Sequence, residues 1–379
     1  MNPNWRKWLG KILAPIYRLM MFGSLKDQPL SDVPDQFSRI LVVRNDNIGD
    51  AVCTIPALEA LKLRFPQAYL AVLVCRLAED VVTGLPWIDK VYVYDKAKHG
   101  RYKSRLVAWW KQWQVIRDIQ RDRFDLALGI RSTFSASLAW LVFASRAGVR
   151  VGVRPPANKA QFDFFYNLPV DPIEDPIHEV ERALLIVKKV GAGEGPKRLS
   201  FFVPPPDIAA AEQFLLKHFG QNRTGPLVGV SLSGRVEDDR WWDTEKFLRL
   251  AGLLERDLGA RVVYTYGPGE KEVVKELNRL SDQPPILFTS ASLKGFAALV
   301  SLTDLFISLE GGPMHVAAAL GVPVLGIFGR TNTAIWAPWG EKTSLVRDEI
   351  HVNRVTVDEA ANAAKIMVAN WYHFSENLS

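Results

Sequence analysis

Cysteine is scarce in this chain, and long apolar runs are missing. Only Cys53 and Cys75 occur among the 379 residues, both in apolar contexts, so we expect neither a disulfide framework nor a metal site. This scarcity fits a reducing cytoplasm, which we expect as the compartment. No uninterrupted apolar run reaches the ~20 residues that span a bilayer, so we expect no transmembrane helix.

Two ligand-binding signatures are also missing. The segment from Arg44 to Asp50 contains only Gly49, so no Gly-x-Gly-x-x-Gly follows the first predicted strand, which disfavours a dinucleotide-dependent dehydrogenase. The 47 Lys and Arg exceed the 41 Asp and Glu and give a net charge of +6, which suits an anionic partner. Because no recognised nucleic-acid motif accompanies this surplus, we expect no nucleic-acid partner.

Acidic residues are missing from segment 1–25. Its charged residues are all basic, namely Arg6, Lys7, Lys11 and Arg18. Its apolar residues recur at helical spacing: Trp5, Trp8, Leu9, Ile12, Leu13, Ile16, Met20 and Phe22. We interpret the segment as a helix in a membrane interface, at the inner face of the inner membrane, with its basic face on anionic lipid. A helix packed on its own protein would show the same spacing.

The length and the 48% apolar content are sufficient for about two domains. From Arg39 onward, short β-branched runs alternate with helical segments. The predicted strands are 40–43, 70–74, 91–94 and 126–130, and the predicted helices between them are 51–65 and 106–120. Continuous apolar strands separated by helices imply a parallel sheet covered on both faces, so we predict a doubly wound α/β domain over 26–203.

A second set of elements follows a proline-rich break at residues 204–206. Its predicted strands are 227–232, 261–266, 305–309 and 322–327, with helices at 244–258, 270–280 and 293–300. We therefore predict a second doubly wound domain over 204–354. A predicted helix at 357–372, within segment 355–379, would return to the first domain. Two such domains leave a cleft between facing strand ends, where ligands bind.

The segment from Glu310 to His315 reads as the end of a buried strand, a glycine turn and the start of a helix. A helix N-terminus presents unpaired N–H groups and the positive end of its dipole, so this turn suits a diphosphate. Gly311 and Gly312 could equally make only a tight strand-to-helix turn.

A matching turn follows the first strand. Gly49 lets the chain turn sharply, and Asp50 falls at or near the helix N-cap, with its carboxylate directed into the predicted cleft. Asp is also a favoured N-cap residue, so the side chain could serve only to cap the helix. Asp46 is a weaker candidate on the same loop.

Together these motifs resemble the heptosyltransferase family of lipopolysaccharide assembly. The resemblance rests on Gly-Asp followed by Pro-Ala-Leu near the start, and on Gly-Pro-Met-His-Val-Ala-Ala-Ala with Gly-Val-Pro and Phe-Gly near the end. It covers residues 39–340 and implies a GT-B fold of two Rossmann-like domains. It further implies inverting transfer of heptose from ADP-heptose to an acceptor on the lipid-anchored inner core, without a cofactor.

The resemblance implies that Asp50 is the general base on the acceptor hydroxyl. The first domain would bind the acceptor, with Asn47, Gly49 and Arg131 as the assigned residues. The second domain would bind the nucleotide-sugar donor and stabilise the departing ADP. The donor-binding residues are Ser231, Ser233, Arg240, Glu270, Glu310, Gly311, Gly312, Pro313, Met314 and His315.

Three of these residues have a second interpretation. Arg240 is placed to bind the diphosphate, but it could be a solvated charge beside the acids at 237–239. His315 could contact the diphosphate or hydrogen-bond the turn and orient Glu310. Glu270 could meet the donor's ribose or base, or simply satisfy a turn and a helix dipole.

The donor half departs from the family pattern at two places. The strand end usually reads Asp-Thr/Ser-Gly, whereas here Glu310 is one methylene longer and Gly311 removes the hydroxyl. The family's Trp-Pro is replaced by Trp241-Trp242. Both changes bear on which nucleotide and sugar are bound.

A basic aromatic stretch lies in the first domain. It combines Trp109, Trp110 and Trp113 with Arg101, Lys103, Arg105 and Lys111. It could hold a phosphorylated, lipid-linked acceptor at the membrane, or it could be a helix with one buried aromatic face.

Three function classes follow. A glycosyltransferase is favoured because an acid-bearing turn in one domain would face a phosphate-binding turn in the other. A nucleotide-sugar epimerase of the same architecture would need more acid and base residues at the sugar. A noncatalytic sugar-nucleotide-binding protein is the third class.

Overall fold

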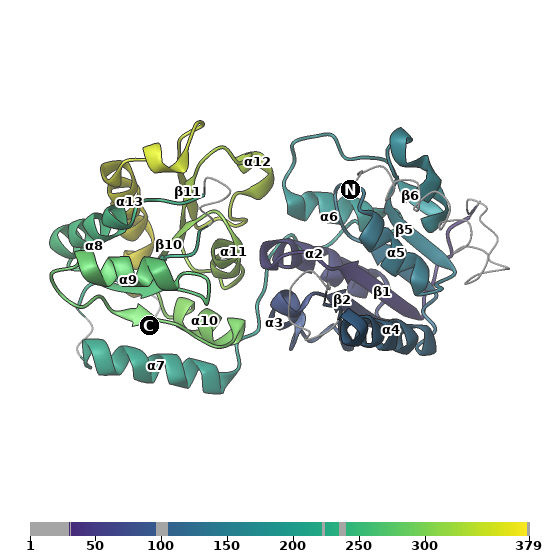
Figure 1. The fold of residues 1–379 in the computed structure, drawn as a ribbon, viewed down its shortest axis with the longest axis horizontal. Coiled ribbons are helices and arrows are strands. Elements are labelled where there is room, and N and C mark those ends of the chain that lie inside the picture. Colours follow the sequence, from purple (N-terminus) through teal and green to yellow (C-terminus); the bar gives the residue numbers. More distant parts are fainter. Residues whose placement is uncertain (1–29, 31, 96–104, 222–223, 235–239, 377–379) are drawn as a thin grey trace.

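The computed structural model describes residues 30, 32–95, 105–221, 224–234 and 240–376. They form two α/β lobes joined side by side (Figure 1). The predicted helix at 1–25, together with Arg101 and Lys103, lies outside the described residues. Within the described part of the chain, no helix has the length and apolar content needed to cross a membrane.

The N-terminal lobe is built on a six-stranded parallel sheet in the order β3-β2-β1-β4-β5-β6. Its central strands are almost entirely buried, as expected for a parallel sheet covered on both faces. The strands are β1 (Arg39–Arg44), β2 (Tyr69–Val74), β3 (Lys90–Val93), β4 (Leu126–Gly129), β5 (Val149–Val153) and β6 (Leu168–Val170).

Helices cover both faces of this sheet because alternate strand residues point to opposite sides. Ile40 and Val42 pack into one core with α2 and α6, whereas Leu41 and Val43 pack into another with α4 and α5. The helices are α2 (Ile48–Arg64), α3 (Glu79–Val82), α4 (Arg105–Arg121), α5 (Ala136–Ala144) and α6 (Glu179–Lys188). The described residues also include three 3₁₀ helices. Two lie in the N-terminal lobe, Arg76–Ala78 and Ala157–Phe165, and one lies in the C-terminal lobe, Val352–Arg354.

The C-terminal lobe repeats this topology. Its parallel sheet has the order β12-β11-β10-β7-β8-β9, so the first strand of each lobe lies beside the fourth. The strands are β7 (Leu227–Ser231), β8 (Arg261–Thr265), β9 (Leu287–Phe288), β10 (Leu305–Leu309), β11 (Val324–Phe328) and β12 (Thr343–Arg347). The strand order reverses between β1 and β4 and between β7 and β10, and open α/β sheets bind ligands at such points.

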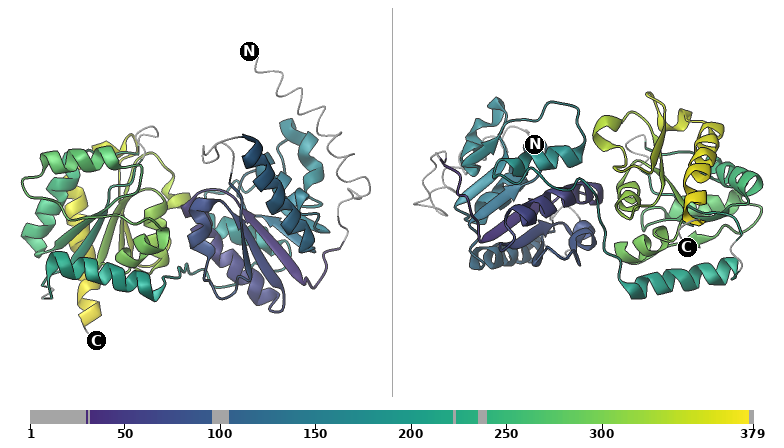
Figure 2. Two further views of the ribbon diagram at one scale, coloured as in Figure 1. Left: turned by 60° about the horizontal axis from the view of Figure 1, so that its bottom comes forward. Right: turned by 180° about the vertical axis from the view of Figure 1, so that it is seen from behind.

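The helices of the C-terminal lobe follow the same alternation (Figure 2). They are α7 (Pro205–Phe219), α8 (Thr244–Leu258), α9 (Lys271–Leu280), α10 (Leu293–Val300), α11 (Gly312–Ala319), α12 (Thr333–Trp336) and α13 (Val357–Glu376). The doubly wound α/β prediction is confirmed for both lobes. The proline-rich break at 204–206 proves to be the start of α7, because proline is well tolerated in the first turn of a helix.

The predicted return of the C-terminal helix to the first domain is wrong for the described residues. α13 packs on α8 and on β10, β11 and β12. Its apolar face enters the core of the C-terminal lobe through Val357, Ala360, Ala361, Ala364, Met367 and Val368. The helix therefore completes the second lobe.

The two lobes meet through two pairs of helices. The N-terminal end of α2 packs against that of α11, and α3 packs against α10. At the second contact, the Asp80 carboxylate accepts hydrogen bonds from the backbone N–H of Leu293 at 3.0 Å and of Lys294 at 3.4 Å. An acid of one lobe thus helps to cap a helix of the other.

Candidate active site

A cleft of about 550 Å³ lies where the strand ends of the two lobes face each other. The N-terminal lobe lines it with the loop after β1, the first turn of α2 and Arg131. The C-terminal lobe lines it with the loops after β7 and β10 and with the start of α11. The two turns identified from the sequence therefore border one cavity.

Asp50 is the third residue of α2, and Asn47 occupies the N-cap position that we expected at or near Asp50. The Asp50 Oδ2 atom accepts hydrogen bonds from the backbone N–H and the side-chain amide of Asn47, each at 3.2 Å. The side chain remains 17% exposed and lines the cleft. Asp50 thus both caps its helix and presents a carboxylate to the cavity.

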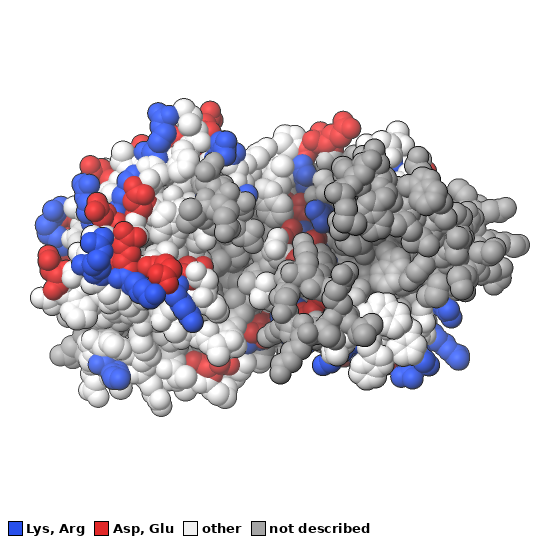
Figure 3. All heavy atoms as spheres, in the orientation of Figure 1, with Lys and Arg blue, Asp and Glu red and all other residues white. Residues whose placement is uncertain are grey.

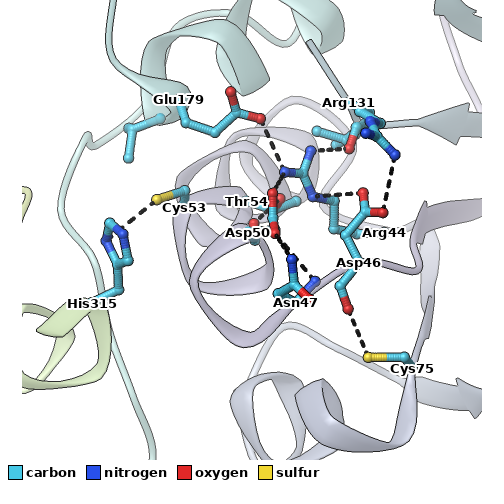
Figure 4. Close-up of polar contacts among 12 residues, drawn as sticks. Arg44, Asp46, Asn47, Asp50, Cys53, Thr54, Cys75, Arg131, Glu179 and His315 are labelled. Atoms are coloured by element: carbon cyan, nitrogen blue, oxygen red, sulfur yellow. Dashed lines mark hydrogen bonds and ion pairs between the residues drawn. The ribbon is translucent and has the colours of Figure 1, made fainter. Parts of the chain in front are cut away.

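Arg44 holds this carboxylate from behind. Its guanidinium lies 2.6 Å from Asp50 Oδ1 and 3.0 Å from Glu179 Oε1, with Asp46 Oδ2 at 3.8 Å, as Figure 4 shows. It also donates to the backbone carbonyl of Ile130. Burial lowers the pKa of Arg44, but the three carboxylates outweigh burial and raise it. Arg44 is therefore a permanent buried cation that fixes the position of Asp50.

Asp46 is held through both its side chain and its backbone. Its Oδ1 atom lies 3.2 Å from the Arg131 guanidinium, and its backbone carbonyl accepts from the Cys75 thiol at 2.7 Å. Arg131 is 39% exposed and lines the cleft. The weaker sequence candidate thus belongs to the same charged network as Asp50.

In the C-terminal lobe, Arg240 pairs with Glu310. The Arg240 Nε atom lies 2.7 Å from Glu310 Oε1, whereas the Glu310 side chain is only 6% exposed and its Oε2 atom has no hydrogen-bond partner among the described residues. Both side chains line the cleft. The acids at 237–239, beside which Arg240 could have been a solvated charge, lie outside the described residues. Among the described residues, Arg240 contacts an acid of the cleft.

The second tryptophan of the Trp241-Trp242 pair anchors this loop. Trp242 is fully buried, and its indole Nε1 donates to the Val355 carbonyl at 2.9 Å. Trp242, two positions after Arg240, is therefore a core residue of the C-terminal lobe.

The glycine turn after β10 has a backbone that favours glycine. Gly311 has φ 154° and ψ −172°, which a side chain such as Ser or Thr would adopt only with strain. Gly312 begins α11, and a Cβ atom there would lie 3.1 Å from Ile48 Cβ. Gly311, Gly312 and Pro313 all line the cleft. The turn therefore brings backbone close to the other lobe.

His315 lies at the contact between α2 and α11. Its Nδ1 atom is 3.8 Å from the Cys53 sulfur (Figure 4), and it is only 3% exposed. Burial, together with nearby His178, lowers its pKa to about 4, although Asp50 opposes this shift. The ring is therefore neutral at pH 7 and joins the two lobes.

The other predicted donor residues divide into two groups. Ser233 and Glu270 line the cleft, and the Glu270 carboxylate also accepts from the Gly267 N–H at 2.7 Å, which is the turn role. Ser231 and Met314 are instead fully buried, away from the cavity lining. The Ser231 hydroxyl accepts from the Ser233 N–H at 3.3 Å, so Ser231 orients the loop.

Asn47, Gly49 and Arg131 line the cleft from the N-terminal lobe. Arg44 and Glu179 did not emerge from the sequence as site residues. Arg44 is the last residue of β1, but Glu179 lies 135 positions away, and only the fold reveals their contact. Among the described residues, there is no group of three or more His, Cys, Asp or Glu side chains that could hold a metal ion.

Comparison with known proteins finds relatives among glycosyltransferases. A putative glycosyltransferase of Haemophilus influenzae is 23% identical over 360 residues, covering 90% of this chain and 99% of the relative. Lipopolysaccharide heptosyltransferase 3 of Escherichia coli is 24% identical over 298 residues, covering 77% and 83%. The solved structure of E. coli heptosyltransferase WaaC with ADP superposes with a TM-score of 0.70 at 21% identity, covering 87% of this chain and 99% of that chain.

The described architecture of two facing parallel sheets is the GT-B fold of these heptosyltransferase structures. The family model of glycosyltransferase family 9 (heptosyltransferase) matches residues 112–364, which is more than half of the chain. The protein therefore belongs to glycosyltransferase family 9, the heptosyltransferase family, and is a glycosyltransferase.

Proposed function

We propose that this glycosyltransferase moves a heptose from ADP-heptose to a lipopolysaccharide core acceptor with inversion at the anomeric carbon. The observation that carries this proposal is that the Asp50 carboxylate and the Gly311–Gly312 turn line the same cleft from opposite lobes. Relatives solved with ADP and with ADP-2-deoxy-2-fluoro heptose support the choice of donor.

In the proposed reaction, Asp50 takes the proton from the acceptor hydroxyl as its oxygen attacks the anomeric carbon. The bond between that carbon and the phosphate oxygen breaks, and ADP leaves with the electron pair. Attack opposite the leaving group inverts the anomeric centre. Arg44 holds Asp50 through a 2.6 Å ion pair and keeps the carboxylate in one position.

The C-terminal lobe stabilises the negative charge that develops on the departing ADP. Arg240 supplies positive charge, and the N–H groups at the start of α11 supply hydrogen-bond donors. Pro313 is tolerated in this first turn because its missing N–H would have had no partner within the helix. Glu310 orients Arg240 through the 2.7 Å contact. Ser233 and Glu270 complete the donor side, while Asn47, Gly49 and Arg131 face the acceptor.

The deciding experiment measures ADP release from ADP-heptose with and without a truncated lipopolysaccharide core acceptor. Acceptor-dependent release with a new glycosidic bond of inverted configuration supports the proposal. Acceptor-independent isomerisation of the sugar would identify an epimerase, and tight donor binding without turnover would identify a noncatalytic binding protein. Retention of configuration would contradict the assigned role of Asp50.

We also propose that segment 1–25 places the enzyme at the cytoplasmic face of the inner membrane. The support is its sequence, in which four basic residues and no acid accompany an apolar helical spacing. Replacing Arg6, Lys7, Lys11 and Arg18 with Gln should weaken sedimentation of the full chain with anionic vesicles. Unchanged sedimentation would reject this role.

A further inference from the structure

Helix α4 presents three large aromatic side chains to solvent. Trp109, Trp110 and Trp113 are 65%, 52% and 43% exposed. Ala108, Ile116 and Ile119 of the same helix are buried instead, and both isoleucines belong to the core on this side of the sheet. The tryptophans are therefore not needed to attach α4 to its own lobe. We call these three residues, with Arg117, the tryptophan face.

The tryptophan face carries one cation in contact with an indole ring. The Arg117 guanidinium lies 4.7 Å from the centre of the Trp113 ring. Lys111 and Arg121 are on the same helix, and its one acid, Asp118, pairs with Arg121 at 3.0 Å. Figure 3 shows blue Lys and Arg atoms beside white surface at the edge of the N-terminal lobe where α4 lies. Indole rings bordered by cations are typical of contacts with an anionic membrane surface.

Helix α4 also contacts a residue that lines a pocket beside the active-site cleft. Gln112, between the exposed tryptophans in sequence, donates from Nε2 to the Asp95 carbonyl at 2.7 Å. Asp95 lines a second pocket of about 740 Å³. This pocket and the cleft share Ile48, Leu77, Ser233, Glu270 and Pro313. Helix α4 is therefore joined through Asp95 to the lining of the pocket beside the cleft.

We propose that the tryptophan face docks the N-terminal lobe on an anionic bilayer, with its indole rings at the level of the lipid headgroups. Segment 1–25 is a poorer partner for the tryptophan face. It carries four basic residues and no acid, so the Arg117 guanidinium would repel it. The inference adds a second membrane contact to the one proposed for that segment. It stands on the exposure and charge of α4 and needs neither the assigned donor nor the assigned base.

The test compares full-length variants by sedimentation with vesicles of phosphatidylcholine alone or mixed with phosphatidylglycerol. Trp109→Ser/Trp110→Ser/Trp113→Ser should reduce partitioning into the anionic vesicles by at least about tenfold. The matched control is Leu216→Ser/Ile350→Ser/Ile366→Ser, which removes three similarly exposed apolar side chains from the C-terminal lobe and should leave partitioning unchanged. Brominated lipids should quench the fluorescence of the parent protein more than that of the tryptophan variant.

Arg117→Glu supplies a second test that retains all three indoles. It should weaken partitioning into the anionic vesicles and not into the neutral ones. Unchanged partitioning of both variants would overturn the proposal. Three further results, each with partitioning unchanged, would assign the face to another partner. A large loss of thermal stability would mean that it packs on segment 1–25, and a raised KM for a soluble acceptor would mean that it binds saccharide. Loss of a dimer would mean that it binds a second copy of the chain. Sedimentation requires no turnover, so its failure is distinct from failure of the proposed reaction.

Discussion

At the scale of the residue, the site depends on one buried cation. Arg44 contacts Asp50 and Glu179 and lies near Asp46, and its own burial makes the loss of any partner costly. The sequence identified Asp50 because Gly-Asp follows a buried strand. It could not identify Glu179, since no local pattern marks an acid whose partner lies 135 positions away.

Asp50→Asn should lower kcat by at least about 10²-fold, because the amide cannot accept the acceptor's proton. The amide oxygen can still accept from the Asn47 N–H, so the overall fold and the Kd for ADP should change little. The free energy of unfolding should fall by about 1–3 kcal/mol, because Arg44 loses one of its counter-charges. Steady-state kinetics and titration calorimetry with ADP test both statements. Asp46→Asn is the control and should cost less activity. Near-normal turnover of Asp50→Asn would remove Asp50 from the reaction.

Glu179→Gln should lower the free energy of unfolding by about 1–3 kcal/mol, because Arg44 loses a buried counter-charge while keeping its other partners. Glu181→Gln on the same helix is the matched control. Glu181 pairs with Lys197 at 2.8 Å where the lysine is 57% exposed, so its loss should cost less than ~1 kcal/mol. Urea denaturation compares the two, and equal effects would contradict the importance that we assign to burial.

At the scale of the element, the sequence predicted more of the central strands than of the sheet edges. The strand at 305–309 and the helices at 244–258 and 293–300 agree with β10, α8 and α10, because buried strands and capped amphipathic helices leave local patterns. The sequence analysis missed β5, β6, β9 and β12. β6 and β9 have only three and two residues, too few for a periodicity, whereas β5 and β12 have five residues each and were overlooked. The destination of α13 was also beyond the sequence, since an apolar face does not specify which surface covers it.

The contact between α2 and α11 requires glycine at position 49. A Cβ atom there would lie 2.6 Å from His315 Cδ2, so Gly49→Ala should push the helices apart and destabilise the protein by about 1–3 kcal/mol. Gly252→Ala in α8 is the control, because nothing lies within 4 Å of its added Cβ. It should stabilise by about 0.5–1 kcal/mol through helix propensity. Calorimetric Tm values test this, and a more stable Gly49→Ala would refute the close packing.

At the scale of the whole molecule, two lobes of equal topology hold a neutral imidazole between them. The pKa of His315 falls from 6.5 to about 4 on folding, so the unfolded chain binds the extra proton more readily. The neutral His315 ring therefore adds up to roughly 3 kcal/mol to the free energy of unfolding above pH 6.5. This contribution is lost as the pH falls toward 4.

His315→Gln should therefore flatten the decline in stability between pH 6.5 and 4, relative to the parent chain. His218→Gln, at an exposed position on α7, is the control and should leave the decline unchanged. Urea unfolding at a series of pH values measures both. Identical pH profiles for the parent and His315→Gln would show that the lobe contact does not exclude the proton.

The hydrogen bonds of the Asp80 carboxylate provide a way to measure opening of the cleft. It caps two backbone amides of α10 from the opposite lobe, so any hinge motion that parts α3 from α10 must uncover those amides. Deuterium uptake at Leu293 and Lys294 would then track how often the enzyme opens to admit donor and release product. Occupancy by ADP that draws the lobes together should slow that uptake without any change in the chemistry of the site.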